Sequence, residues 1–298
     1  MPRLEFVGYI STVVNDINNM PKQILVPTDF SKNALNAINY ALKLFKGQEC
    51  DFYLLNVFGV SGYSLDNMMV PEPGEMAYEA AKNKSEEELQ KLLRQLQFSS
   101  EHTFHTISVY NSLLDAIRHT LTNQEIDMIV MGTKGSSGAA RVFFGSNTVE
   151  VMEKITTSPV LAVPENEMIV VPEEIVFPTD FLTGFKHIEL QYLLEIAMLQ
   201  KAVIKILHIG LESDLNKAQQ ENRALLESLF QEVEHTFHFR DGNKISAEIK
   251  DFIKDSGCNM LAFVNRKHGF FENIFYKPLV KEIGYQSEIP ILALHDSP

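Results

Sequence analysis

Ile24-Leu25-Val26-Pro27-Thr28-Asp29-Phe30 and Ile175-Val176-Phe177-Pro178-Thr179-Asp180-Phe181 are two versions of one stretch, a short apolar run that ends in Pro-Thr-Asp-Phe. Two more pairs of segments follow in the same order. Glu101–His105 returns unchanged as Glu234–His238, and Ser158–Val163 returns in looser form as Glu288–Leu294. Three matches in one order predict two homologous units in a single chain.

The length of 298 residues suits two domains of ordinary size, and a hydrophobic content of 45% gives each of them a core. We expect a first domain over 21–165 and a second over 172–298, called here the first and the second copy. The link between them is short, so the two copies are expected to pack as an intramolecular pseudo-dimer, and a further homodimer of two chains stays an open alternative. Residues 1–20 are an N-terminal extension without the pattern of a secretory signal, and no function is assigned to them.

Charge and composition exclude several classes of partner. The net charge of -13 argues against non-specific binding to nucleic acid or to an anionic membrane surface. No apolar run approaches the roughly 18–20 residues of a membrane span. Cys50 and Cys258 occupy unmatched places in the two copies, which favours reduced thiols and a cytoplasmic protein over a disulfide.

Hydrophobic patterning predicts strands that alternate with helices in both copies. Several of the strands are uniformly apolar, which is typical of a parallel sheet that helices cover on both faces. We therefore expect an α/β fold. The strands are expected at 23–27, 51–58, 103–109, 127–131 and 159–163, and again at 174–178, 202–209, 236–239 and 260–264. The helices are expected at 32–46, 75–96, 113–121 and 147–155, and again at 185–199, 214–233 and 245–254.

A glycine-rich loop follows the buried strand 127–131 and ends where a helix begins. It reads Gly132-Thr-Lys-Gly135-Ser-Ser-Gly138-Ala-Ala-Arg141-Val-Phe-Phe-Gly145-Ser146-Asn147, a G-x2-G-x9-G-[ST] pattern. Glycines let the backbone approach a ligand closely, and the amides at a helix start are donors that favour anions. This pattern is neither a dinucleotide fingerprint nor a Walker loop. It predicts a phosphate site, against the alternative of an ordinary surface loop.

Taken together, these motifs make the chain resemble a tandem universal stress protein, with two domains of that family in one chain. The resemblance rests on Val26–Ser31, Leu54–Val57, Met131–Gly135 with Gly145-Ser146, and Ser158–Val163, in that order. It implies a fold similar to the adenine-nucleotide alpha-hydrolases. In that fold each domain is an open sheet of five mainly parallel strands in the order 3-2-1-4-5, and the last strands of the two copies pair with each other.

The resemblance also implies ATP, or ADP or AMP, together with Mg²⁺, across the carboxyl ends of strands one and four of the first copy. Asp29 and the backbone of Val57 are expected beside the adenosine, and Pro27, Thr28 and Met131 line the same place. The phosphate positions are Gly132, Gly135, Gly145 and Ser146, and Asn147 adds a polar contact.

The second copy lacks the glycines. When 127–131 is aligned with 259–263, Gly132 becomes Val264, Gly135 becomes Lys267, and Gly145-Ser146 becomes Lys277-Pro278. Side chains replace bare backbone, and Pro278 has no amide proton. We expect no ATP site of the same kind there. The second copy is then either a structural partner or a binder of another ligand, with Arg266 among the cations available to an anion.

His102 and His105, repeated as His235 and His238, are the most tempting metal ligands, but their spacing puts them on opposite faces of a strand. No metal site is therefore expected. Three functions remain for the chain. The first is a nucleotide-dependent regulatory protein of the stress response, with at most weak hydrolysis and no identifiable catalytic residue. The others are a slow ATPase or phosphotransferase, and a structural module with an empty loop.

Overall fold

A computed structural model of the chain describes residues 20–60, 74–133, 145–165, 169–242, 244–266 and 289–296. The elements of the first copy are β1 (Lys22–Pro27), α2 (Lys32–Leu44), β2 (Cys50–Val57), α3 (Glu75–Gln95), β3 (His102–Val109), α4 (Leu113–Asn123), β4 (Met128–Gly132), α5 (Ser146–Lys154) and β5 (Val160–Val163). Those of the second copy are β6 (Glu174–Pro178), α6 (His187–Gln200), β7 (Val203–Ile209), the 3-10 turn η1 (Glu212–Asp214), α7 (Lys217–Leu229), β8 (His235–Arg240), α8 (Ile245–Ser256), β9 (Met260–Asn265) and β10 (Ile291–His295).

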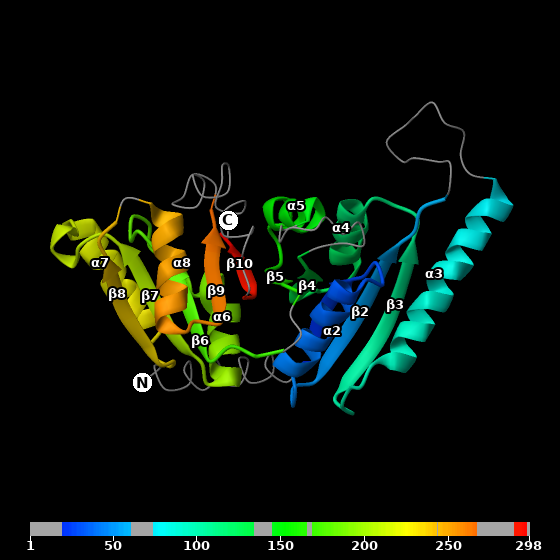
Figure 1. The fold of residues 1–298 in the computed structure, drawn as a ribbon, viewed down its shortest axis with the longest axis horizontal. Coiled ribbons are helices and arrows are strands. Elements are labelled where there is room, and N and C mark those ends of the chain that lie inside the picture. Colours follow the sequence, from blue (N-terminus) through cyan, green and yellow to red (C-terminus); the bar gives the residue numbers. More distant parts are fainter. Residues whose placement is uncertain are drawn as a thin grey trace, which may run out of the picture.

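All of these strands join one ten-stranded sheet in the order β3-β2-β1-β4-β5-β10-β9-β6-β7-β8. Figure 1 shows the sheet running across the molecule, with the first copy at one end and the second at the other. Each half of the sheet has five parallel strands in the order 3-2-1-4-5, as the sequence predicts.

The two halves meet at β5 and β10, the antiparallel pair in the middle of the sheet. Ala162 pairs with Ile291, and Val160 pairs with Ala293. The predicted pairing between the last strands of the two copies is thus confirmed. Because these residues are buried, the seam between the copies is part of the hydrophobic core. The domain borders at 21–165 and 172–298 remain a prediction.

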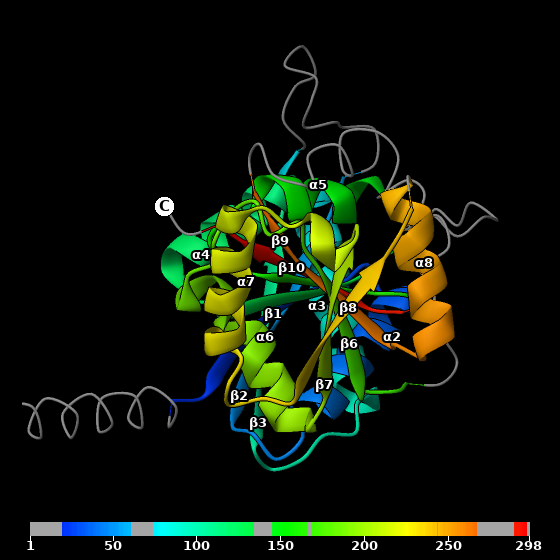
Figure 2. The ribbon, with the colours of Figure 1, turned by 90° about the vertical axis from the view of Figure 1, so that its left-hand side faces the viewer.

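Helices cover both faces of the sheet. One face packs against α2, α3, α6 and α7, and the other packs against α4, α5 and α8. Figure 2 shows this for the second copy, where α6 and α7 lie on one side of β6, β7 and β8 and α8 lies on the other. Neighbouring residues of β1 belong to different layers, since Ile24 faces the first and Leu25 the second. None of the helices among the described residues has the length and apolarity needed to cross a bilayer.

Local sequence sets where the helices begin. The Ser31 hydroxyl accepts a hydrogen bond from the Ala34 amide and starts α2, as expected for a serine N-cap. In the second copy the helix expected at 214–233 starts later, at Lys217. Asn216 and Gln219 form a reciprocal capping box there, which fixes the first turn. The helix expected from 185 starts at His187, where the Glu189 side chain accepts from the Lys186 amide.

The register of the sheet tests the alignment of the two copies. Ile24 pairs with Met128 in the first copy, and Ile175 pairs with Met260 in the second. Ile24 and Ile175 are the same position of the repeated motif, so Met128 corresponds to Met260. Four residues further along each strand, Gly132 therefore corresponds to Val264, as the sequence alignment has it.

Candidate functional site

The carboxyl end of β1 carries the Thr28-Asp29 pair of the repeated motif. Thr28 is buried, and its amide donates to the Leu55 carbonyl at 2.8 Å. Its hydroxyl accepts from the Phe30 amide at 3.1 Å, and Phe30 turns the chain with a left-handed φ of 62°. Asp29 is exposed at the edge of the sheet, where its carboxylate accepts from the Ser31 amide. The turn therefore places a carboxylate just before the start of α2.

The carboxyl end of β4 lies directly beside it, because β1 and β4 are paired strands. The Thr133 amide donates to the Val163 carbonyl at 3.0 Å, and the Gly145 amide donates to the Thr133 carbonyl. The second bond joins the two ends of the glycine-rich loop, and the first ties Thr133 to the end of β5. Gly135, Lys134 and Arg141 lie outside the described residues.

Helix α5 begins at Ser146 with Gly145 as its N-cap, and no side chain caps its first turn. By contrast, Ser31 and Ser112 cap α2 and α4 with their hydroxyls. The first turn of α5 is held against β4, since the Thr148 hydroxyl donates to the Gly132 carbonyl at 2.8 Å. Ser146 and Asn147, at the start of α5, are therefore exposed close to the end of β1 and Asp29. A helix start in this position favours an anion.

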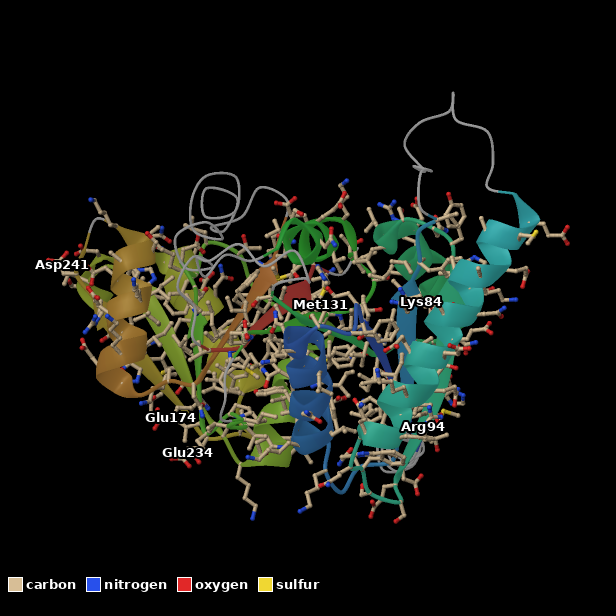
Figure 3. The ribbon with its side chains drawn as sticks, turned by 45° about the vertical axis from the view of Figure 1, so that its right-hand side comes forward. Lys84, Arg94, Met131, Glu174, Glu234 and Asp241 are labelled. Carbon is tan, nitrogen blue, oxygen red and sulfur yellow. The ribbon has the colours of Figure 1, made fainter. Side chains whose placement is uncertain are left out.

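Three other predicted residues lie at or beneath this edge of the sheet. The side chain of Met131 is 5% exposed and packs into the core beneath α4 and α5, and Figure 3 labels it in the interior of the molecule. Val57 ends β2 beside Val109 and is half-buried. Pro27 is buried next to Leu55 at the end of β1. These residues shape the edge of the sheet from beneath.

A buried polar chain supports the end of β1, and the sequence prediction missed it. The Asn56 amide donates to the Thr28 carbonyl at 2.7 Å, the Ser85 hydroxyl donates to Asn56 at 2.7 Å, and the Ser108 hydroxyl donates to Ser85 at 2.7 Å. The chain of bonds ties β2, α3 and β3 to the residue before Asp29. The signal that could have revealed it is a polar side chain inside an otherwise apolar strand.

An open cavity of about 510 Å³ lies between the end of β2 and helix α3, and Asn56 and Ser85 of this polar chain line it. Phe30 and Phe58 line it from the sheet, and Ala81 and Lys84 line it from α3. Lys84 is among the side chains that Figure 3 labels.

The second copy closes the corresponding space with its own side chains. His208 takes the place of Asn56, and its Nδ1 lies 2.9 Å from the Thr179 carbonyl. Phe181, which corresponds to Phe30, is 1% exposed and stacks on the His208 ring at 5.1 Å. From α7, Gln219 donates to the Asp180 carbonyl and Asn222 donates to the Phe181 carbonyl.

The end of β9 is closed as well. Val264 is buried where the first copy has Gly132. Two positions further on, the Arg266 guanidinium lies 2.6 Å from the Glu189 carboxylate and donates to the Gly184 carbonyl at 2.8 Å. Arg266 also lies over the Phe185 ring at 4.5 Å. This arginine is engaged inside the protein, so the predicted cation for an anion in the second copy is already paired. Lys267, Lys277 and Pro278 lie outside the described residues.

The carboxylate of Glu189 stays ionised in this pairing. Burial alone would raise its pKa, but hydrogen bonds from the Lys186 amide and from Arg266 outweigh burial and hold the pKa below its usual range. Asp296, at the end of β10, shows the opposite shift. Burial and the hydrogen bond with Glu189 raise its pKa. Charged groups of β9, β10 and α6 therefore converge at this edge of the second copy.

The repeated histidines do not gather into a metal site. His102 is buried with its Nε2 3.2 Å from the Phe45 carbonyl, whereas His105 is exposed and lies 3.3 Å from Asp51. They thus face opposite sides of edge strand β3, as predicted. Across the described part of the chain, no three His, Cys, Asp or Glu side chains are placed to hold a metal.

Comparison with known proteins agrees with the fold. The model of the universal stress protein family matches residues 20–164. Universal stress protein MJ0531 of Methanocaldococcus jannaschii is 28% identical over 157 residues, which cover 52% of this chain and 88% of that protein. A universal stress protein from Archaeoglobus fulgidus has the same fold with a TM-score of 0.69 at 15% identity, over 92% of this chain and 96% of its own. A putative universal stress protein from Pseudomonas aeruginosa gives a TM-score of 0.57 at 12% identity, over 94% of this chain and 95% of its own.

Proposed function

Since this chain belongs to the universal stress protein family through residues 20–164, we propose that it binds ATP in its first copy and acts as a nucleotide-dependent regulatory protein of the stress response. The ligand lies across the carboxyl ends of β1 and β4, where open α/β sheets bind their ligands. Whether this site is occupied or empty would change the contacts that the protein offers to partners.

The observation that carries the proposal is the meeting of three features at one edge. Asp29 stands after β1, Gly132 ends β4 beside it, and α5 starts there without a side-chain cap. Amides at an uncapped helix start are donors that a phosphate can satisfy. Bonds from Thr148 and Gly145 hold this helix start at the end of β4.

In this proposal each predicted residue keeps a defined role. Asp29 and the Val57 backbone contact the adenosine, and Pro27, Thr28 and the Met131 backbone form the floor. The phosphates meet Gly132, Gly135, Gly145, Ser146 and Asn147. Mg²⁺ accompanies the phosphates when ATP is bound. ADP and AMP are weaker or alternative ligands, because they offer fewer phosphate oxygens to the same donors.

The second copy, 172–298, acts as a structural partner of the first, 21–165. Buried Val264 and the Arg266–Glu189 pair support this part of the proposal, since their side chains stand where the first copy has Gly132 and the start of its glycine-rich loop. Both cysteines are buried free thiols, which is consistent with the cytoplasmic setting we propose.

The two copies provide a matched test. Asp29→Ala and Asp180→Ala change the same position of the same motif, and only the first lies at the proposed site. By isothermal titration calorimetry with ATP and Mg²⁺, we expect one site per chain, a loss of at least tenfold in affinity for Asp29→Ala, and no change for Asp180→Ala. Gly145→Lys should also weaken binding, whereas Glu227→Lys on the exposed side of α7 should not.

Two results would overturn the proposal. One is equal effects of the two aspartate substitutions, and the other is no ATP binding by the unmodified protein. Incubation of the same protein with Mg²⁺ and ATP distinguishes the alternative of an enzyme. Steady release of phosphate that Asp29→Ala abolishes would favour a slow ATPase or phosphotransferase over a purely regulatory binder.

A further inference from the structure

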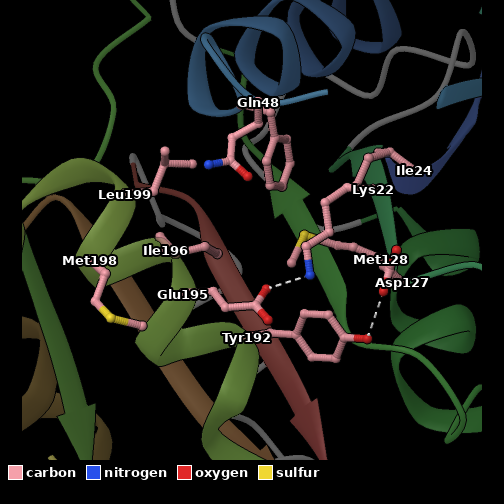
Figure 4. A pocket seen from close by; sticks show the side chains of 11 residues that line it. Lys22, Ile24, Gln48, Asp127, Met128, Tyr192, Glu195, Ile196, Met198 and Leu199 are labelled. Carbon is pink, nitrogen blue, oxygen red and sulfur yellow. Dashed lines mark hydrogen bonds and ion pairs between the residues drawn. The ribbon is translucent and has the colours of Figure 1, made fainter. Parts of the chain in front are cut away.

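A second cavity, of about 360 Å³, lies between the two copies at the opposite edge of the sheet from the proposed ATP site. It opens where β1 begins with Lys22 and where Asp127 precedes β4, and helix α6 of the second copy forms its other side. Figure 4 shows the side chains from the two copies facing each other across it. Its volume is within the range of small-molecule sites, which often lie at domain interfaces.

Most of the wall is apolar. Its apolar side chains are Ile24, Phe45, Met128, Ile196, Met198 and Leu199. Three of them are almost fully buried, so the floor of the cavity is continuous with the core of the sheet. Met198 is 48% exposed, so part of this apolar wall faces solvent.

Four of the five polar side chains that line the cavity form two pairs that bridge the copies, and the fifth is Gln48. Lys22 Nζ lies 2.8 Å from a Glu195 carboxylate oxygen. The Tyr192 hydroxyl donates to Asp127 Oδ1 at 3.2 Å, and the other oxygen of Asp127 accepts from the Gln23 amide at 2.9 Å. Burial, with Asp127 and Glu195 nearby, raises the pKa of Tyr192, so its hydroxyl stays a neutral donor. Figure 4 draws both bridges as dashed lines.

Three charged side chains line the cavity, and their charges do not cancel. Asp127 and Glu195 carry two negative charges, and Lys22 carries one positive charge, which leaves one negative charge in excess. Glu195 is 35% exposed and Lys22 is 20% exposed, so this excess is only partly screened by solvent. An anionic ligand such as ATP is disfavoured here, and a cation is attracted.

We propose that this cavity is a binding site for a hydrophobic amine, a molecule with a compact aromatic or aliphatic body and one ammonium group. The body fills the apolar space between Phe45 and Ile196, and the ammonium group lies toward Glu195 and Asp127. The site is independent of the proposed ATP site, because it lies at the amino ends of the strands. An occupant there touches both copies and so stabilises their packing.

Three probes of one shape and different charge test the proposal on the full chain. They are 1-naphthylmethylamine, which is cationic at pH 7, 1-naphthylmethanol, which is neutral, and 1-naphthoate, which is anionic. We expect the amine to bind about tenfold more tightly than the alcohol, and the naphthoate to bind weakest, as measured by naphthalene fluorescence or calorimetry. Saturating ATP should leave the affinity of the amine unchanged.

Variants locate the probe. Glu195→Gln should weaken binding of the amine by about tenfold and leave binding of the alcohol unchanged, whereas Lys22→Met should strengthen binding of the amine. Glu227→Gln, which removes an exposed acid of α7, should change neither. Leu199→Trp should block all three probes by filling the cavity, with folding checked by thermal unfolding. Equal affinity for amine and alcohol, tightest binding of naphthoate, displacement by ATP, or indifference to both Glu195→Gln and Leu199→Trp would each overturn the proposal.

Discussion

Gly132, the last residue of β4, packs directly on Asn33 in the first turn of α2. A Cβ atom at position 132 would stand 2.9 Å from Asn33 Cγ and 3.0 Å from the Asn33 carbonyl oxygen. Contacts this short force the neighbour to move, and the backbone carbonyl has little freedom to do so. The packing of α2 on the sheet therefore requires glycine here, whether or not a phosphate is bound. In the second copy, Val264 occupies the matching position and is buried.

Gly132→Val is expected to lower the free energy of unfolding by about 1–3 kcal/mol, the usual cost of overpacking a well-filled site. ATP affinity should fall as well, because the end of β4 moves. Gly59→Ala is the matched control, since a Cβ there meets nothing within 4 Å. Urea denaturation of the two variants measures their free energies of unfolding. A Gly132→Val protein as stable as the Gly59→Ala protein would show that α2 can shift freely.

Asn56 gives a second prediction, on the support of Asp29. Asn56→Ala leaves the buried Thr28 carbonyl without its side-chain donor, and this should cost about 1–3 kcal/mol of unfolding free energy. Asn56→His should cost less, because His208 contacts the same carbonyl in the second copy. Asn83→Ala, an exposed change on α3, should have no such cost. If Asn56→Ala unfolds at the same urea concentration as Asn83→Ala, the polar chain contributes nothing to stability.

The sequence was sufficient to predict the sheet, and the reason is the repeat. Buried strands are uniform apolar runs, and the second copy of each motif confirms the first, so strand positions agree with the structure within a residue or two at Lys22–Pro27 and Glu174–Pro178. The order of the strands came from the family resemblance. The pairing of the last strands, 160–163 with 291–294, followed from the same resemblance, whereas its antiparallel direction and the register of Leu161 with Leu292 come from the structure.

Contacts between elements were not predictable in the same way. Periodicity says which side chains are buried but not which of them touch, so the Asn56–Ser85 bond and the Gly132–Asn33 contact were missed. Helix ends were misplaced for a related reason. The apolar stripe of α7 continues to Phe230 and Val233, which are buried, although the helix stops at Leu229. A buried residue after a helix end has the same pattern as one inside the helix.

His295, the last residue of β10, makes stability depend on pH. Burial lowers its pKa to about 4, from an ordinary value of 6.5. Below pH 6.5 the unfolded chain binds a proton at this histidine and the folded chain does not, so stability falls as the pH drops from 6.5 to 4. The full difference is on the order of 3 kcal/mol. Urea denaturation between pH 7 and pH 4 should show this loss, and His295→Leu should reduce it. His119→Gln, an exposed change on α4, should leave the dependence of unfolding free energy on pH unchanged. The same dependence in His295→Leu as in the unmodified protein would contradict the role of His295.

The Arg266–Glu189 pair leads to a prediction about how substitutions of its two residues affect the free energy of unfolding. The side chains of Arg266 and Glu189 are 11% and 2% exposed, so removing one partner leaves a charge with little water around it. Arg266→Met alone should cost about 3–5 kcal/mol of unfolding free energy. The double change with Glu189→Leu should recover most of this loss, apart from the cap that Glu189 gives to the Lys186 amide, worth about 1 kcal/mol. A double-mutant cycle in urea measures the coupling, and ATP affinity serves as a control that should stay constant because the pair lies outside the first copy. Additive losses in the cycle would mean that the two side chains stabilise the second copy independently, and that Arg266 remains available to an external anion.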